Sequence, residues 1–462
     1  MKKFSFLIFL VGLLFLSCSK TSFTTSSNAY LLIPDSIKFD TIFTSIGSTT
    51  QSFKIFNPNK QSIHINEIKL SGGENSYFKM NVNGQSNYDF QNIDLAGGDS
   101  MYVFVAVNIT PNDSTMPFLA GDSIGITYNS HQQFVQLQAY GQNAVFMKAQ
   151  TINQDTTWTN HLPIVLLGNL TVATNTTLTI EKGTKIYAHA KTAFEVNGTL
   201  IANGGTDTAD RILFTNDRFD YPYVESTNQW FGINFGADSK GNILNNVTVL
   251  NAYIGIADTM LNQPQTAVRL SLNGCILSNH DYAALYLRNA NASIINSLIT
   301  NSGAQVILEN GGDYSFNYCT LVGYNNNFVP HGNPSLIIDN NPEIGATSAL
   351  QATITNCIVY GDYTTEIETL EGALQNFSID FNYGLYKVDS RLPLSGFTFS
   401  NSMQNTDPQF QEINGWANTY NFQLQATSPA IGTATPNATT TDILGQPRDA
   451  QHPTIGCYES RP

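Results

Sequence analysis

The chain has 462 residues, of which 11% are aromatic and only 12% are charged, about half the usual charged share of a soluble domain. The chain is too long for one ordinary core, and the scarcity of charge disfavours a protein built from amphipathic helices. A formal net charge of −14 repels nucleic acid, which we exclude as a partner, and repels acidic polysaccharide unless a cation intervenes.

The N-terminus, MKKFSFLIFLVGLLFLSCSK, is typical of a cleaved export signal, because its apolar run is too short to span a bilayer. It resembles the signal of bacterial lipoproteins: Ser17 and Cys18 match the end of the lipobox, although Phe15 stands where leucine is usual. The resemblance implies removal of residues 1–17, lipidation of Cys18 and a membrane anchor. The residue after the cysteine is Ser19 and not aspartate, which in that family favours the outer membrane.

Two questions about this N-terminus stay open. A plain secretory signal with a chance cysteine would also fit the sequence. In addition, there is no acidic cluster after Cys18 that would indicate whether the protein faces the periplasm or the cell surface. Residues 18–29 are rich in Ser and Thr, which is typical of a flexible tether. We therefore predict a lipidated tether at 18–29 that links the membrane to the folded protein.

Residues 30–145 contain short alternating segments such as SIKFDTIF, QSFKIFNPN and MYVFVAVNITP, separated by turn residues. Their number and even spacing predict a β-sandwich of antiparallel strands. The stretches Phe39–Leu70, Leu95–Pro111 and Val135–Gln142 resemble the immunoglobulin-like domains of the ASH and choice-of-anchor D type. The resemblance implies a spacer or binding domain and no particular chemistry.

A different pattern begins near residue 150, with GNLTVATNTTLTIEKGTKIYAHAKTAFEVNGTLIANGG at Gly168–Gly205. This run resembles the first coils of right-handed parallel β-helix proteins, and RILFTN and QWFGINF complete that family's usual opening. DPQF, SPAIG, TDILGQPR and IGCYE resemble its closing cap. We therefore predict an all-β chain in which an immunoglobulin-like β-sandwich precedes a right-handed parallel β-helix with a C-terminal cap at 150–462.

Five related stretches repeat inside the predicted helix: NVTVLN, NGCILSN, NSLITNS, NYCTLVG and NCIVYG. Steps of 27, 23, 21 and 39 residues separate their opening asparagines, which is the spacing of a solenoid with insertions. Alternation within each stretch gives one shared inward position, and the Asn or Gly after each stretch indicates a turn. The shared inward position is occupied by Val247, Cys275, Ser297, Cys319 and Cys357.

The cysteines could be oxidised in an exported protein. Neighbouring coils of a parallel sheet are roughly 4.8 Å apart, so the Ser297 coil would separate Cys275 from Cys319 by more than disulfide reach. We therefore expect these cysteines to be free and buried as small apolar side chains. No repeat is visible at 363–405, where we expect an insertion or irregular coils.

An acidic cluster surrounds the strand RILFTN. Its carboxylates are the ligands that Ca²⁺ prefers, but their order differs from a dedicated calcium loop and arginines are interleaved with them. Solvated turns are the interpretation we favour, with a calcium site as the alternative and no other cofactor indicated. The candidate metal ligands are Asp207, Asp210, Asp217 and Asp220.

No catalytic residue is assigned. His280 and Asp281 are adjacent and make a poor general-base pair in a strand, since neighbouring side chains point to opposite faces, and a turn with no catalytic role explains them better. The run Glu366–Glu371 is interpreted as a solvated loop. Serine or cysteine triads, zinc spacings and phosphate loops are absent from the sequence in recognisable form.

Aromatic residues make carbohydrate binding feasible, because their rings stack on sugars while amides and charges bind the hydroxyl groups. We predict a non-catalytic envelope lipoprotein, a structural or binding module that presents its β-helix to glycans or envelope proteins. The alternatives are a polysaccharide lyase or glycoside hydrolase, or a pure spacer. Trp230 occupies a position where the helix family often has a structural tryptophan. The candidate ligand-binding residues are Trp158, Tyr253, Tyr282, Tyr286 and Arg288.

Overall fold

The computed structural model describes residues 22–259, 267–340, 348–370, 377–389, 391 and 394–460. The chain divides into two compact units, at 1–143 and 144–462. The export signal and the proposed lipidation of Cys18 lie outside the described residues. Within the described part of the chain, no helix has the length and apolar character needed to cross a membrane.

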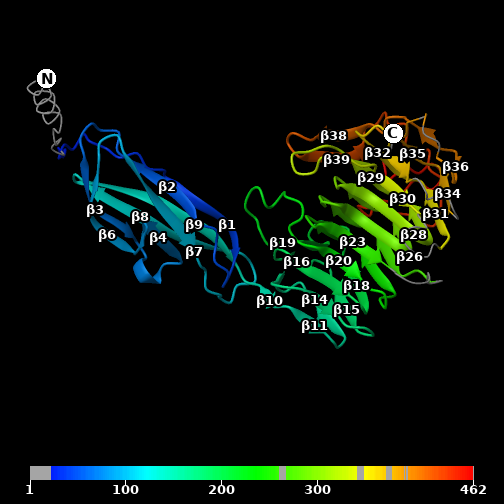
Figure 1. Cartoon of the computed structure of the whole chain (residues 1–462), viewed down its shortest axis with the longest axis horizontal. Helices are drawn as coiled ribbons and strands as arrows, with labels where there is room; N and C mark the ends of the chain where they lie inside the picture. The colour runs from blue at the N-terminus through cyan, green and yellow to red at the C-terminus, as the bar shows by residue number, and fades with distance from the viewer. Residues whose placement is uncertain are drawn as a thin grey trace, which may run out of the picture. The chain divides into compact units, whose positions relative to one another are not determined.

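The first unit is a β-sandwich (blue to cyan in Figure 1). Its strands pair antiparallel except β1 and β9, which run parallel. Inward side chains such as Ile65 and Val103 are fully buried and alternate with exposed ones. One sheet has the order β1 (Ser36–Phe43), β9 (His131–Gln142), β8 (Phe118–Tyr128), β3 (Ile63–Leu70) and β6 (Asp89–Leu95); the other has β2 (Gln51–Phe56), β7 (Ser100–Val107), β4 (Phe78–Val82) and β5 (Gln85–Ser86), with the short helix η1 at Gly73–Asn75.

The second unit is a parallel β-helix whose coils pass in turn through three strips of strands. Successive coils stack in Figure 1 from β11 towards β36. The first strip of strands is an 11-stranded parallel sheet. It comprises β10 (Val145–Met147), β13 (Ile164–Leu166), β16 (Lys185–Ala188), β19 (Ile212–Asn216), β22 (Val247–Leu250), β25 (Ile276–Ser278), β27 (Leu298–Thr300), β29 (Thr320–Gly323), β32 (Ile358–Gly361), β35 (Leu385–Tyr386) and β37 (Met403–Gln404).

The second and third strips join into one sheet, because β26 (Ala283–Ile295) and β28 (Ala304–Asn317) run through both. The remaining strands of the second strip are β11 (Gln150–Ile152), β14 (Leu170–Val172), β17 (Ala193–Val196), β20 (Gly232–Phe235), β23 (Ile254–Thr259), β30 (Leu336–Asp339) and β33 (Ile367–Thr369). Those of the third are β12 (Thr156–Trp158), β15 (Thr177–Ile180), β18 (Thr199–Asn203), β21 (Asn242–Asn245), β24 (Leu270–Asn273), β31 (Leu350–Thr355), β34 (Phe377–Asn382) and β36 (Phe397–Ser400).

The side chains at the shared inward position of the five repeated stretches, which we call the inward ladder, lie in the interior as predicted. Val247, Cys275, Ser297, Cys319 and Cys357 are all fully buried, and β27 separates the strand beside Cys275 from the strand beside Cys319. The four described cysteines are free and buried. Cys275, Cys319 and Cys357 therefore serve as small interior side chains, as expected.

Asparagines make the sharp bends between strips. Asn251, Asn279 and Asn301, each directly after a strand of the first strip, have φ of 63°, 63° and 47°, the left-handed region that Asn tolerates. Their side chains also bond from coil to coil: Asn279 Nδ2 donates to Asn251 Oδ1 at 2.7 Å, and Asn251 Nδ2 donates to Asn216 Oδ1 at 2.7 Å. The predicted turn chemistry is thus confirmed and extended into a side-chain ladder.

Two expectations for the C-terminal third change. Residues 363–405 contribute strands β33 to β37, so regular coils continue where an insertion or irregular coils were expected. The segment expected to close the helix packs along the outer face of the first strip, where it covers Leu298, Val322, Ile358 and Leu385. It includes the hairpin of β38 (Phe410–Asn414) and β39 (Thr419–Leu424). The strands of the first strip are apolar on both faces, so their outward side chains must also be buried, and the C-terminal segment buries them.

Candidate functional site

The four aspartates predicted as calcium ligands are not gathered around one point. Among the described residues there is no group of three or more His, Cys, Asp or Glu side chains that could hold a metal ion. Asp207 lies exposed in a turn, and the other three each bind a basic side chain. The pairs are Asp210 with Lys182 at 2.9 Å, Asp217 with His189 at 2.7 Å and Asp220 with Arg218 at 2.6 Å.

Trp158 does not belong to a binding surface, which corrects its prediction as a ligand-binding residue. Its side chain is only 5% exposed and packs edge-on against Phe194 inside the helix, with ring centroids 5.9 Å apart. Trp158 ends strand β12 on an inward position, so alternation sends the indole into the core. Trp230 is also buried, and its indole N–H donates to the Leu250 carbonyl at 2.8 Å, consistent with the expected structural role.

Tyr253 and Tyr282 are brought together on the surface. They begin the second-strip segments of successive coils, where the Tyr282 amide donates to the Tyr253 carbonyl at 2.9 Å. Their rings stack with centroids 5.8 Å apart and planes 22° apart, and they are 38% and 46% exposed. Phe231, 43% exposed, precedes Tyr253 by one coil, because the Trp230–Ala252 bridge aligns the two coils. The three residues form an aromatic column across β20, β23 and β26.

Tyr286 and Arg288 extend this surface along β26. The Tyr286 ring meets Tyr282 edge-on at 6.3 Å, and its hydroxyl donates to Glu309 Oε2 on β28. Arg288 Nε lies 3.7 Å from the other oxygen of Glu309. Burial raises the pKa of Tyr286, and the bond to the Glu309 carboxylate raises it further, so the phenol stays protonated as a donor. Four of the five predicted ligand-binding residues are thus neighbours.

Smaller side chains stand in register with Tyr286 on the two preceding coils. On β23 the residue in register with Tyr286 is Ala257, and on β20 it is Asn234. Asn234 is half-buried, and its amide donates to Glu195 at 3.0 Å. The methyl side chain of Ala257 thus lies between a tyrosine and an asparagine in this row. We call this region, with Phe231, Tyr253, Tyr282, Tyr286, Asn234, Ala257, Arg288 and Glu309, the tyrosine face.

His280 and Asp281, beside the tyrosine face, do not form a catalytic pair. His280 is fully buried, its Nδ1 accepts the Ala252 amide at 3.2 Å, and burial lowers its pKa to about 3, so it is neutral. Asp281 is exposed and points away to Thr227, 3.2 Å from its hydroxyl. The interpretation of this stretch as a structural turn agrees with the geometry.

A second polar region was missed in the sequence. Glu366 is fully buried, so the interpretation of its run as a solvated loop is wrong at this residue. Its carboxylate accepts the Ser335 hydroxyl at 2.8 Å and lies 3.4 Å from His331 Nε2, while His331 Nδ1 binds Asp362 at 2.7 Å. Burial lowers the pKa of His331, but the two carboxylates outweigh it and raise that pKa to about 9. These residues come from different coils, so no local spacing reveals them.

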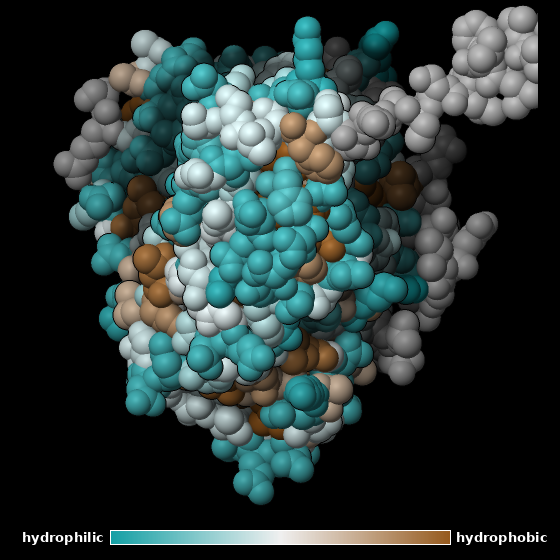
Figure 2. Space-filling model, turned by 90° about the vertical axis from the view of Figure 1, so that its left-hand side faces the viewer, coloured by the Kyte–Doolittle hydropathy of each residue, from teal (hydrophilic) through white to brown (hydrophobic). Residues whose placement is uncertain are grey.

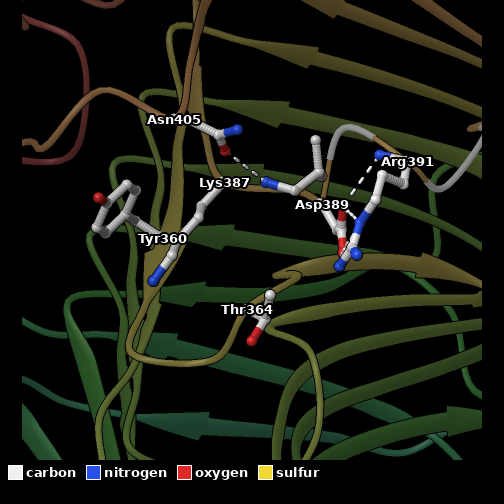
Figure 3. Close-up of a pocket in the computed structure, with 7 residues that line it drawn as sticks. Tyr360, Thr364, Lys387, Asp389, Arg391 and Asn405 are labelled. Atoms are coloured by element: carbon white, nitrogen blue, oxygen red, sulfur yellow. Dashed lines mark hydrogen bonds and ion pairs between the residues drawn. The ribbon is translucent and has the colours of Figure 1, made fainter.

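A pocket of about 330 Å³ lies against the last coils (Figure 3). Lys387 reaches towards the Tyr360 ring, with its Nζ 5.2 Å from the ring centroid, and donates to the Gly361 carbonyl at 2.8 Å. Asp389 and Arg391, two positions apart in the pocket's lining, pair with each other at 2.5 Å. Asp389 and Arg391 therefore neutralise each other, while Lys387 is held by a backbone carbonyl and an aromatic ring.

No protein-family model and no curated protein matches the chain. One similar solved structure is a family 123 glycoside hydrolase from Clostridium perfringens, with 9% identity over 26% of this chain and a TM-score of 0.18. The match spans about 28% of that protein. Another is the catalytic unit of a GH87 α-1,3-glucanase from Streptomyces thermodiastaticus, with 9% identity, 80% and 90% coverage of the two chains and a TM-score of 0.21. Likeness this low assigns neither fold nor activity.

Proposed function

We propose that this protein is a non-catalytic carbohydrate-binding module whose tyrosine face binds glycans. The observation that carries the proposal is the exposed parallel stack of Tyr253 and Tyr282 on successive coils. Burying aromatic area is favourable, and rings left in water at a fixed spacing suit a flat ligand with an apolar face and a polar rim. A sugar ring has that shape and chemistry.

The polar residues of the face complement this platform. Arg288, oriented by Glu309, supplies charged donor atoms at one side, and Asn234 supplies an amide at the other. Hydrogen bonds between charged groups and hydroxyls are stronger than neutral ones, so these residues would orient a sugar stacked on the rings. The side chains come from rigid strands, which limits the entropy lost on binding.

A polysaccharide lyase or glycoside hydrolase is the second candidate. A glycosidase needs a carboxyl group kept protonated beside its substrate. Burial raises the pKa of Asp258, yet this side chain is fully enclosed and bound to Arg269 at 2.8 Å. It belongs to the interior and not to the tyrosine face, so we place binding ahead of catalysis.

We further propose that the module is an outer-membrane lipoprotein anchored through Cys18. The sequence Ser17-Cys18 after an apolar run supports this proposal. Replacing Cys18 with Ala should abolish lipid labelling and membrane retention. Retention of the Cys18→Ala protein in the membrane fraction would refute the anchor, while leaving the binding function untouched.

A glycan array tests the binding function. The soluble form beginning at Ser19 is screened with and without Ca²⁺, and each hit is analysed for products. Stacking of each ring contributes on the order of 1 kcal/mol, so Tyr253→Ala/Tyr282→Ala should weaken binding at least about tenfold. Tyr140→Ala, which removes a tyrosine 52% exposed on the sandwich, is the matched control.

Each outcome of the array decides between candidates. Binding that the double variant loses, without products, supports the proposed module. Product formation on any hit would replace it with an enzyme. Binding that is unchanged in the double variant, or no binding to any glycan, would refute the tyrosine face as the site.

A further inference from the structure

A cleft of two joined pockets, of about 460 and 480 Å³, lies between the β38–β39 hairpin and the segment after β29. The pockets share Tyr324, Asp362 and Ile413. Much of the remaining lining is amide, including Asn325, Asn327, Gln409 and Gln425. Side-chain amides offer both donors and acceptors, which suits a ligand rich in hydroxyl groups.

Trp416 stands at the rim of this cleft, on the turn between β38 and β39. Its side chain is 89% exposed, whereas Trp158 and Trp230 are 5% and 1% exposed. The turn is fixed to the opposite wall, because Asn327 Nδ2 donates to the Trp416 carbonyl at 3.3 Å. A large ring held in water beside a cleft is poorly explained by packing and suits contact with a ligand.

Asp362 is a pre-positioned acceptor on the cleft wall. Its Oδ1 binds His331 at 2.7 Å, and its Oδ2 accepts the Asn325 amide at 3.0 Å and the Asn325 side chain at 2.7 Å. Burial opposes its ionisation, but the hydrogen bonds from His331 and Asn325 lower its pKa. The side chain is still 35% exposed. A carboxylate with one acceptor position left and a fixed orientation can accept a ligand hydroxyl with little loss of entropy.

The charges around the cleft favour a neutral ligand. Asp362 and Glu366 lie beside the cationic His331, and Lys387 lies against the ring of Tyr360, which lines the smaller pocket of the cleft together with Asp407. Two cations thus offset two of the three carboxylates, and among the described residues no group of three or more side chains is placed to hold a metal ion, so the wall creates little demand for a cation. The amides and the exposed indole of the lining are complementary to a ligand that has hydroxyl groups and an apolar ring face.

We propose that this cleft is a second carbohydrate site, in which a neutral sugar ring stacks on Trp416 and a hydroxyl group donates to Asp362. The inference rests on the proposed carbohydrate-binding function, but the site shares no residue with the tyrosine face. The two sites can therefore fail independently.

Trp416 provides its own readout, because it is the exposed tryptophan and the other two are buried. Neutral oligosaccharides of glucose, galactose, mannose and N-acetylglucosamine are titrated into the Ser19 form while iodide quenching of tryptophan fluorescence is recorded. We expect one of these sugars to protect Trp416 from iodide. Protection should persist in Tyr253→Ala/Tyr282→Ala and should need at least about ten times more sugar in Asp362→Ala.

Trp416→Ala is a second variant that tests the cleft even if Asp362→Ala misfolds, since an exposed side chain can be removed without disturbing the core. Its array signal for the protecting sugar should fall about tenfold, whereas the Tyr140→Ala control should keep its signal. Absence of protection by every sugar tested, or protection that disappears with Tyr253 and Tyr282, would overturn the cleft site. In either case, array binding that depends on those two tyrosines would leave the proposed function standing.

Discussion

The coils of the β-helix and the segment packed on their outer face are stabilised in opposite ways. Along the coils the same contact recurs, both in the asparagine ladder and in the inward ladder of small side chains. In the C-terminal segment a single charged residue makes many contacts: Arg448 binds Asn296, Thr454, Gly456 and Glu459 and lies 3.8 Å over the Tyr318 ring. Because each repeated contact contributes only a small part of the stability, we expect a substitution in either ladder to lower the free energy of unfolding less than a substitution in the C-terminal segment.

The largest effect is predicted for Arg448→Met. The change removes a buried guanidinium and leaves the carboxylate of Glu459, itself 3% exposed, without its cation. Loss of one partner of a buried pair typically costs about 3–5 kcal/mol. The free energy of unfolding, measured in urea by tryptophan fluorescence, reports on the second unit, since all three tryptophans lie there.

The double variant Arg448→Met/Glu459→Gln is the control for that prediction. Removing the stranded charge should recover at least about 1 kcal/mol relative to the single variant, because an unpaired buried ion is the costly species. A double variant no more stable than Arg448→Met would show that the contacts to Asn296 and the backbone carbonyls dominate. The C-terminal segment would then depend on hydrogen bonds and not on charge.

The second prediction concerns pH. The pKa of His331 is about 9 in the folded protein and about 6.5 when unfolded, so folding favours the protonated form. The resulting stabilisation, up to about 3 kcal/mol, is fully present below pH 6.5 and is lost as the pH rises through 9. The unfolding free energy of the wild type should therefore fall over this range.

His331→Gln is the matched variant, since glutamine cannot carry the charge. Its unfolding free energy should resemble that of the wild type most closely above pH 9 and differ most below pH 6.5. A wild-type-minus-variant difference that stays constant between these limits would exclude the charge contacts with Asp362 and Glu366 as the source of stability.

A smaller effect is predicted in the asparagine ladder. Asn279→Gly keeps the left-handed backbone but loses the side-chain bonds to Asn251 and to the Glu225 carbonyl, which should cost about 1 kcal/mol. Asn279→Ala loses the same bonds but, unlike glycine, keeps a β-carbon at a φ of 63° without the polar side chain that lets asparagine tolerate it, which adds about 1 kcal/mol. Equal unfolding free energies for the two variants would show that the backbone at this bend is not strained.

The order of the sandwich and the helix, and the inward ladder, could be predicted from sequence because they rest on local alternation and a repeated step. The tyrosine face was partly predictable: Tyr253, Tyr282, Tyr286 and Arg288 were found, whereas Phe231 and Glu309 emerge only when the coils are set in register. Trp158 was misassigned because composition does not reveal which face a residue occupies.

The cleft residues could not be predicted in the same way. His331, Asp362 and Glu366 meet through insertions of unequal length, so neither periodicity nor spacing brings them together. The run Glu366–Glu371 has the composition of a loop, and only the fold shows that its first carboxylate is buried beside a cation. Residues in insertions between the repeated strands thus cannot be placed from the repeat itself.

The smallest effect is predicted for Cys275→Val. Val247 fills the equivalent inward position one coil earlier, so the interior accepts this shape, and the change should alter the unfolding free energy by less than about 1 kcal/mol. The lost group is a weak thiol donor, 3.3 Å from the Leu244 carbonyl. Cys275→Asp is the contrasting variant and should cost more than about 4 kcal/mol, because it buries a charge without a partner. A loss of more than about 2 kcal/mol in Cys275→Val would mean that the ladder positions are not interchangeable, and that the redundancy of the coils is weaker than their repetition implies.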